Sequence, residues 1–402
     1  MPNFKYTVKN QEGKTVIGEA DAKSKENLIE LLRKQNFTII SIGDEHKTQA
    51  KKNQLAKKVK LEDLVIFSRQ LATMVEAGIT LVSVLDILSQ QIENKGFSMV
   101  IAKLRDDVET GSSFSQALAK HPKIFSQLYI NLVKAGESSG MLDEILNRVA
   151  GYLEKTASLQ RKVKTAMVYP IAVISIAMGI TTFLLVKVVP TFQGIFDMLG
   201  GSLPLPTLIL IGISNFVRHW LLLGIIGIVI LGIALARYIK TEQGRFMFDS
   251  FMLKLPIFGD IIRKVSVAKF SRTLSTLVKS GVPILSSLDI VAKTAGNKIV
   301  ERAVEQSRQA VREGKNLAEP LSKSPVFPPM VVRMISVGEQ AGELEKMLTK
   351  IADFYDEQVD AAVSGLTSMI EPLIILFLGV VVGGIVLAIF MPIFKITEII
   401  GH

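Results

Sequence analysis

The chain has 402 residues, of which 49% are hydrophobic and 21% charged, with a net charge of +10 and a mean hydropathy of +0.37. It is too apolar for a purely soluble protein and too charged for a transporter that lies almost wholly in the membrane, so we expect water-soluble domains joined to a few membrane helices. The absence of cysteine excludes disulfides, thiolate metal sites and cysteine nucleophiles.

Candidate catalytic and metal-binding residues are scarce. The histidines are His46, His121, His219 and His402, and no two of them have the spacing of a zinc site or a catalytic dyad. The sequence also lacks a GxxxxGK[ST] phosphate-binding loop. We therefore expect no enzyme activity, no cofactor and no metal site, so any energy must come from a partner.

Residues 1–42 read as two extended segments with alternating apolar residues, a short helix from Ser24 and a third extended segment. This order predicts a small ββαβ unit. The N-terminus lacks the continuous apolar core of a secretory signal. Residues 43–60 are polar and rich in lysine, which predicts a basic linker.

Residues 61–168 carry six runs of apolar residues at three- and four-residue steps. Short segments with Gly, Ser, Pro or Asn separate these runs, as expected between neighbouring antiparallel helices. The segment therefore predicts a helical bundle of six helices, the last of which continues past Gln160 toward the membrane.

Three apolar windows, 169–189, 220–236 and 372–394, are candidate membrane helices. The third has no charged residue and as a helix would reach about 35 Å, enough to cross a bilayer with some tilt. Prolines and polar residues interrupt 190–219, so we expect an extracytoplasmic loop with an interfacial helix there. Residues 395–402 would form an extracytoplasmic tail.

Basic residues set the expected orientation, because they favour the cytoplasmic side of a membrane. They stand just before the first window and just after the second, as Arg161, Lys162, Lys164, Arg237, Lys240 and Arg245. Both polar blocks, 61–168 and 237–371, are therefore predicted to be cytoplasmic, with the N-terminus cytoplasmic and the C-terminus extracytoplasmic. The modest positive charge suits an anionic lipid bilayer and acidic protein partners, and nothing indicates nucleic-acid binding.

The chain contains an internal duplication. Residues 67–87 and 270–290 are identical at eleven of twenty-one positions at an offset of 203. After a one-residue shift, GESSGML at 136–142 matches GEQAGEL at 338–344, so 237–371 predicts a second helical bundle. The sequence therefore predicts an all-α membrane protein with two homologous antiparallel bundles, three transmembrane helices and the N-terminal ββαβ unit.

Each copy ends in a membrane window, because Tyr169-Pro170 matches Glu371-Pro372. The window 220–236 is then the odd element that returns the chain to the cytoplasm. Since both copies have the same orientation, this is a parallel repeat, unlike the inverted repeats of many alternating-access carriers.

The chain thus has two bundles with a GExxGxL motif, each followed by a proline at the membrane boundary, and a third span between them. This arrangement resembles the inner-membrane platform family of type IV pilus assembly and type II secretion, the PilC/GspF proteins. The resemblance covers essentially the whole chain. It implies a non-enzymatic protein of the cytoplasmic (inner) membrane that contacts a hexameric assembly ATPase and passes its motion to pilin or pseudopilin transmembrane helices. It also implies contact with other inner-membrane assembly proteins and a homo-oligomer, and it does not separate pilus, secretion and competence machines.

The repeated motif supplies the first candidate site, Glu137 and Gly140 in copy one and Glu339 and Gly342 in copy two. One interpretation is structural: the carboxylate caps the start of the following helix by accepting backbone N–H groups. The other is that it faces the ATPase. Asp86 and Asp289 also match between the copies, and we assign them no role.

Residues at the membrane boundary form the second candidate site. Glu371 matches Tyr169, a residue type that prefers the headgroup level, so we expect Glu371 at the cytoplasmic rim rather than at the bilayer centre. It would be either a rim residue with no special task or the partner of a cation on a pilin or another platform subunit. Pro170 and Pro372 each remove a helical hydrogen bond, which predicts a bend or a moving joint.

Small residues in the spans are the third candidate. Ser175 and Gly179 in the first window, and Gly379 and Gly383 in the third, allow close helix contact. Such faces favour self-association or the docking of a pilin helix, although glycine is simply frequent in membrane helices. Two other functional classes stay open: the second is a membrane carrier or channel, and the third is a membrane enzyme. The windows offer almost no polar lining for transport.

Overall fold

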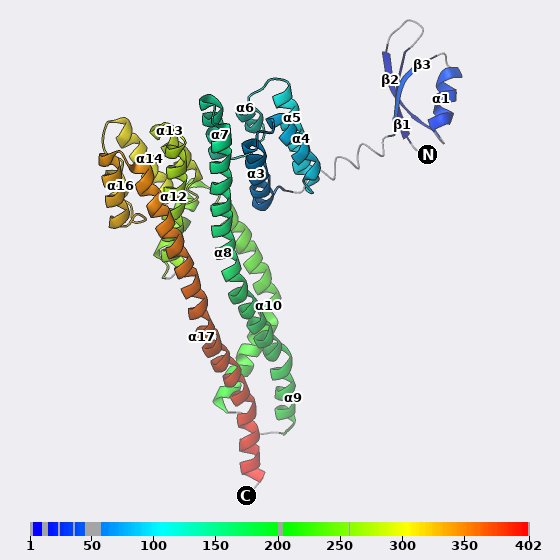
Figure 1. Cartoon of the computed structure of the whole chain (residues 1–402). Helices are drawn as coiled ribbons and strands as arrows, with labels where there is room; N and C mark the ends of the chain where they lie inside the picture. Colours follow the sequence, from blue (N-terminus) through cyan, green and yellow to red (C-terminus); the bar gives the residue numbers. More distant parts are fainter. Residues whose placement is uncertain are drawn as a thin grey trace. The chain divides into compact units, whose positions relative to one another are not determined.

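The structure is a computed structural model that describes residues 3–9, 15–22, 25–34, 37–44, 58–199, 204–256 and 258–400. By packing, the chain divides into two units, Met1–Ser126 and Gln127–His402. Apart from three N-terminal strands, the described elements are helices (Figure 1). The division falls inside the first copy of the repeat, because two helices of that copy pack with the second copy.

The N-terminal part of the first unit contains β1 (Asn3–Lys9), β2 (Thr15–Asp21), α1 (Lys25–Lys34) and β3 (Thr38–Asp44). The strands form an antiparallel sheet in the order β2-β1-β3. Its small core consists of Val8, Ala22, Leu28 and Leu32, of which the two leucines lie one helical turn apart on α1. Residues 45–57 of the predicted linker lie outside the described residues.

The same unit holds four helices of copy one: α3 (Leu61–Glu76), α4 (Leu81–Gln91), α5 (Lys95–Glu109) and α6 (Phe114–Ala119). Their turns follow from capping residues. Asn94, for example, accepts the backbone N–H groups of Gly96 and Phe97 at the start of α5. The rings of Phe67, Phe97 and Phe125 are fully buried, with Phe67 edge-on to Phe97 at 5.4 Å.

The second unit begins with the last two helices of copy one, α7 (Gln127–Ser139) and α8 (Leu142–Phe183). A π-helical turn, η1 (Leu184–Val188), and α9 (Val189–Leu199) continue α8. Copy one therefore has the six helices that its apolar periodicity predicts. After α10 (Leu205–Tyr238) comes α11 (Glu242–Lys254), which the sequence analysis did not predict.

After α11, which opens copy two, six further described helices match those of copy one: α12 (Phe258–Lys279), α13 (Ile284–Thr294), α14 (Lys298–Arg312), α15 (Ala318–Ser322), α16 (Pro329–Ala341) and α17 (Leu344–Ile400). The duplication extends to backbone conformation, since Gly78 and Gly281 have φ of 84° and 72° at matching positions. A Phe270–Phe327 ring pair at 4.9 Å corresponds to Phe67–Phe125 at 6.1 Å. The two copies therefore share turns and core as well as sequence.

Helices α8, α12 and α17 meet in an apolar cluster on the bundle side of the predicted membrane boundary. We call it the juxtamembrane cluster: Ile261, Val359, Val363 and Leu366, with Leu159, Val163, Ala166, Met167, Val265, Ala362 and Ile370 packed around them. Helix α8 belongs to copy one and α12 and α17 to copy two. The cluster thus joins the copies within one unit, and Figure 1 shows α8 and α17 leaving it as two long helices.

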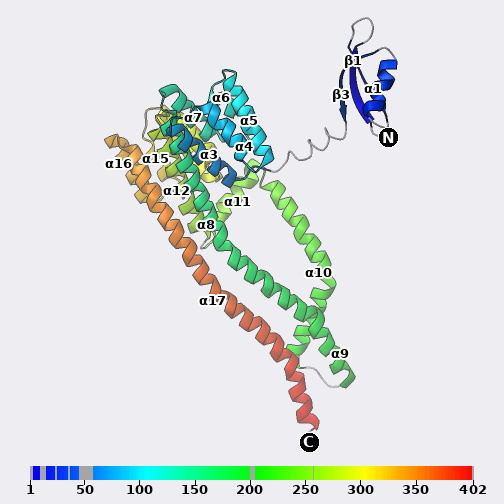
Figure 2. The same cartoon turned by 45° about the vertical axis from the view of Figure 1, so that its right-hand side comes forward.

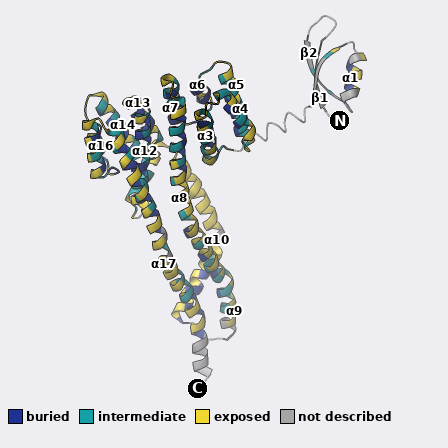
Figure 3. Ribbon diagram, viewed as in Figure 1, coloured by how far each residue is buried: buried dark blue, intermediate teal, exposed yellow. Residues whose placement is uncertain are grey.

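Two helices are long and apolar enough to cross a membrane: Leu142–Ile195, which includes α8 and η1, and Leu344–Pro392 of α17. The two arms of α10, Leu205–Trp220 and Leu223–Tyr238, meet at 60° and pass the same test only together. The described residues therefore hold two membrane-length helices, or three if α10 counts as one. Figure 2 shows the bend in α10, and exposed residues cover its second arm (Figure 3).

The far ends of these helices meet in a second group, the outer cluster: Leu185, Val189, Leu210, Ile211, Ile385, Ala388 and Ile389. The hydroxyl of Thr207 donates to the carbonyl of Ala388 at 2.6 Å, and that of Ser214 donates to the carbonyl of Leu185 in the π-helical turn. The region 190–219, expected to be a loop with one interfacial helix, is mostly helical. Its apolar residues pack in the outer cluster, as Phe192 and Val217 show.

Candidate functional site

In copy two, the GExxG motif forms the turn between α16 and α17. A Cβ atom at Gly338 would lie 2.9 Å from Cγ of Met347 and 3.1 Å from Cα of Leu344, so only glycine lets the two helices approach this closely. Gly342 ends α16 in the left-handed conformation, with φ of 72°. The two glycines therefore set the contact and the turn.

Glu339 lies between these glycines and holds another helix. Both of its carboxylate oxygens accept the backbone N–H of Leu317, at 2.8 and 3.0 Å. Leu317 is the N-cap residue of α15, where an anion is also favoured by the helix dipole. The capping interpretation expected the start of the following helix. It was wrong on that point, because the carboxylate reaches back to the preceding α15.

The motif of copy one repeats this geometry in α7 and α8. A Cβ atom at Gly136 would lie 2.9 Å from Cβ of Ile145, and Gly140 has φ of 73°. Glu137 is half-buried at the position that matches Glu339. The first glycine of each motif was missed as a site residue, although GExxGxL at repeat spacing already contained it.

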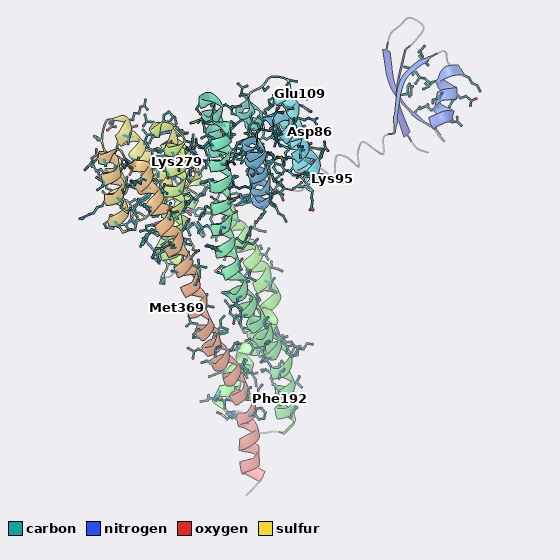
Figure 4. All side chains as sticks on the ribbon, in the orientation of Figure 1. Asp86, Lys95, Glu109, Phe192, Lys279 and Met369 are labelled. Carbon is teal, nitrogen blue, oxygen red and sulfur yellow. The ribbon has the colours of Figure 1, made fainter. Side chains whose placement is uncertain are left out.

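The matched aspartates, to which we assigned no role, form equivalent ion pairs. Asp86 on α4 pairs with Arg105 on α5 at 2.5 Å, and Asp289 on α13 pairs with Arg308 on α14. The side chain of Asp86 is labelled in Figure 4. Arg105 and Arg308 also match at the offset of 203, so comparing the copies would have marked all four residues, although not their contacts.

Polar contacts join α8 of copy one to both α12 and α17 of copy two. The hydroxyls of Tyr152 and Thr273 lie 3.2 Å apart, and burial raises the pKa of Tyr152 above its usual value. Closer to the membrane boundary, Lys162 of α8 and Asp360 of α17 form an ion pair at 2.5 Å. Near the top of α12, the guanidinium of Arg148 donates to the carbonyl of Lys279, which Figure 4 labels.

One arginine fastens α12 to α17 within copy two. Arg272 donates to Asp353 at 3.0 Å and to Asp356 at 2.5 Å, and only 17% of its side chain is exposed. A buried guanidinium between two carboxylates fixes the geometry of the helix pair. The α8–α12–α17 junction therefore combines this ion-pair contact with the juxtamembrane cluster.

The candidate residues at the membrane boundary lie in uninterrupted helices. Pro170 is buried within α8, and Pro372 is exposed within α17. Tyr169 is 52% exposed, whereas the side chain of Glu371 lies outside the described part of the chain. Neither proline ends its helix, so bundle and membrane segment are one helix in each copy.

Within the described part of the chain, the small residues of the spans contact no other helix closely. A Cβ atom at Gly179, Gly379 or Gly383 would meet nothing within 4 Å, and the hydroxyl of Ser175 donates to the carbonyl of Ile171 in its own helix. Among the described residues, no group of three or more His, Asp or Glu side chains could hold a metal ion. Of the candidate sites, the repeated GExxG motif is therefore the one at which described residues make contacts between helices.

The model of the type II secretion system protein F family matches residues 67–190 and 270–392, and the model of that protein's N-terminal domain matches residues 1–43. The chain belongs to this family. The two matches of the protein F family begin at Phe67 in α3 and at Phe270 in α12, and they include most of both bundles and of both long helices. The duplication seen in the sequence and in the turns is therefore the family's own repeat.

Relatives within the protein F family come from pilus and secretion systems. The chain is 45% identical to the type IV pilus assembly protein PilC of Thermus thermophilus over 98% of both chains. It is 43% identical to the protein of the same name from Myxococcus xanthus, over 98% of this chain and 95% of the relative. The type II secretion system protein F of Vibrio cholerae is 32% identical over the full length of both. This chain thus resembles, over nearly its whole length, proteins named for pilus assembly and for type II secretion, and it has helices long and apolar enough to cross a membrane.

Proposed function

We propose that this protein is an inner-membrane platform of a type IV pilus or type II secretion machine. In this role it couples a cytoplasmic hexameric assembly ATPase to the insertion of pilin or pseudopilin subunits into a growing filament. The family and the relatives' names support the choice of machine. The coupling role rests on one observation: α8 and α17 continue without a break from the bundles into the membrane-length segments.

Continuous helices transmit displacement. At about 1.5 Å per residue, the 42 residues of α8 extend about 63 Å and the 57 residues of α17 about 86 Å. Each therefore reaches from a bundle across a hydrocarbon core about 30 Å thick. Because the juxtamembrane cluster and the Lys162–Asp360 pair hold α8 against α17, a push on bundle two should move both membrane segments together.

The topology that suits this role has three spans, with both bundles and the N-terminus in the cytoplasm and the C-terminus outside. The chain lacks cysteine, so single cysteines can be introduced without a background. In intact cells, a membrane-impermeant maleimide should label Asn215→Cys and spare Lys134→Cys and Lys323→Cys until the cells are opened. Opposite labelling of Lys134→Cys and Lys323→Cys would place the bundles on different sides and refute the proposal.

The partners can be tested by photo-crosslinking in cells that assemble filaments. A crosslinker at Val380, which is 66% exposed on α17, should capture pilin or pseudopilin, and one at Ile389, which is 7% exposed, should not. A crosslinker at the exposed Lys134 should capture the ATPase, with the fully buried Leu348 as its control. Ion conduction by the reconstituted protein, without these crosslinks, would favour the carrier or channel alternative.

The role of Glu371 needs a functional readout, and we propose that it pairs with a cation on a pilin or on a second platform subunit. Glu371→Gln removes the charge, and Glu371→Tyr introduces the residue of the matching position in copy one. Both should reduce pilus or secretion output at normal protein levels in the membrane. Normal output from both variants would make Glu371 a rim residue without a special task.

A further inference from the structure

A pocket of about 590 Å³ lies within the second unit, between α8 of copy one and α11 and α12 of copy two. This volume falls in the range of small-molecule sites. Most of its wall is apolar and comes from all three helices: Leu159, Val163, Met167, Phe248, Met252 and Val265. The loop 295–297 also lines it.

Four cations line this pocket; Lys155 and Lys164 are exposed and Arg272 is paired with Asp353 and Asp356, which leaves Lys269. Lys269 of α12 is half-buried, and its ammonium donates a long hydrogen bond, 3.4 Å, to the carbonyl of Ala295. None of the described carboxylates lies within ion-pair distance of it. Burial lowers the pKa of Lys269, and the nearby charge of Arg245 lowers it further. Two cations thus converge at the 295–297 loop.

The carboxylates of the pocket are already engaged elsewhere. Asp249 accepts the backbone N–H of Lys298 at 2.6 Å. Asp356 is held by Arg272 at 2.5 Å. The positive charge of Lys269 is therefore available to an anion that enters the pocket.

The bundle fold does not require this lysine. In copy one, the position that matches Lys269 at the offset of 203 is Ile66, on the equivalent helix α3. A half-buried cation without a carboxylate partner costs stability. A ligand with a negative charge would remove that cost, which gives a reason for the difference between the copies.

We propose that this pocket binds a single-chain amphiphilic anion, with its charged group at Lys269 and its acyl chain along α8. The pocket continues from Thr156, near Lys269, to Met167 at the membrane boundary, a rise of about 16 Å along α8. The apolar wall suits a chain, and the lysine suits a carboxylate or phosphate. Both a free fatty acid and a lysophospholipid have this chemistry.

Such a ligand would act on the junction of the two copies. It would contact α8 from copy one and α11 and α12 from copy two, and so would add apolar contacts to the juxtamembrane cluster. Occupancy would stiffen the link that we assign to force transmission. The binding site itself does not depend on that assignment.

The test uses the full-length protein in phosphatidylcholine nanodiscs with photoactivatable probes of one chain length: a fatty acid, a lysophosphatidylglycerol and the neutral monoacylglycerol. We expect an anionic probe to label peptides from 156–167 and 248–269. Lys269→Gln should weaken saturable labelling about tenfold or more, the worth of a charge-assisted hydrogen bond. Lys279→Gln, an exposed site on the same helix, should leave it unchanged.

Comparison of the three probes identifies the ligand and can overturn the inference. Stronger labelling by the fatty acid or by the lysophospholipid shows which of the two anions the pocket binds. Equal labelling by the neutral probe, or labelling of the membrane segments that ignores Lys269→Gln, refutes the site. Lys269→Ile, which reproduces copy one, should fold and melt at or above the wild-type temperature, so loss of labelling in it cannot be attributed to unfolding. A lower melting temperature would show that Lys269 is structural and would also refute the inference.

Discussion

Replacing Gly136 by alanine tests whether the repeated motif sets the contact between α7 and α8. The new Cβ would lie 2.9 Å from Cβ of Ile145 and 3.0 Å from its Cγ1, whereas carbon atoms prefer about 3.5–4.0 Å. Ile145 is 1% exposed and branched at Cβ, so it cannot turn away within its helix. The two helices must therefore separate by about 0.6 Å or more.

The expected cost is the difference between two opposing effects. Overpacking a core costs about 1–3 kcal/mol, and the rigid neighbour places Gly136→Ala in the upper half of that range. Alanine recovers about 1 kcal/mol of helix propensity. The net destabilisation should be about 1–2 kcal/mol, which corresponds to a melting temperature lower by about 2–6 °C.

Gly151 provides a matched control on α8, because an added Cβ there would meet no atom within 4 Å. Gly151→Ala should stabilise by about 0.5–1 kcal/mol through helix propensity alone. Both variants can be melted in detergent and followed by circular dichroism. If Gly136→Ala is as stable as Gly151→Ala, the helices separate freely and the close-contact reasoning is wrong.

Three further outcomes are expected. Gly342→Ala forces alanine to a φ of 72° and should destabilise by about 1–2 kcal/mol, seen as a lower melting temperature; no change would show that the turn relaxes. The hydrogen bond from Lys293 lowers the pKa of Asp289, so its stabilisation is present above the unfolded pKa of about 3.9 and is lost at lower pH. Asp289→Asn should therefore lower the melting temperature at pH 7 and by progressively less as the pH falls below about 3.9, and a pH-independent difference would contradict this. Lys162→Asp should reduce filament or secretion output, and the double variant with Asp360→Lys should restore it. Because the pair is exposed, the free energy of unfolding should change by at most about 1 kcal/mol. If the double variant does not restore output, the pairing is contradicted.

Much of the fold follows from the sequence because it depends on local periodicity and on the repeat. Apolar residues every three or four positions gave six helices in copy one, and the offset of 203 transferred them to copy two. Helix α11 was missed because its apolar residues are spread around the helix: Met247 and Phe251 are exposed on one face, whereas Phe248 and Met252 line a pocket on another. Its N-cap Thr241, which accepts the N–H of Gly244, was a local signal for its start.

The contacts between distant segments could not be predicted in the same way. Nothing local shows that Lys162 meets Asp360, or that Glu339 reaches back to Leu317. These contacts depend on how whole helices pack, and apolar periodicity gives only the buried face, not the partner. The Asp–Arg pairs are an intermediate case, because the repeat marks both residues but not their contact.

The two clusters that hold α8 and α17 are separated by a fixed length. Along α8, Met167 of the juxtamembrane cluster and Leu185 of the outer cluster are about 27 Å apart. That length is close to the thickness of a bilayer's hydrocarbon core. The α8–α17 pair is therefore matched to one length of lipid tail. In a thicker or thinner bilayer, either the lipids around the pair would deform or the two helices would tilt. Filament or secretion output should consequently vary with the acyl-chain composition of the membrane.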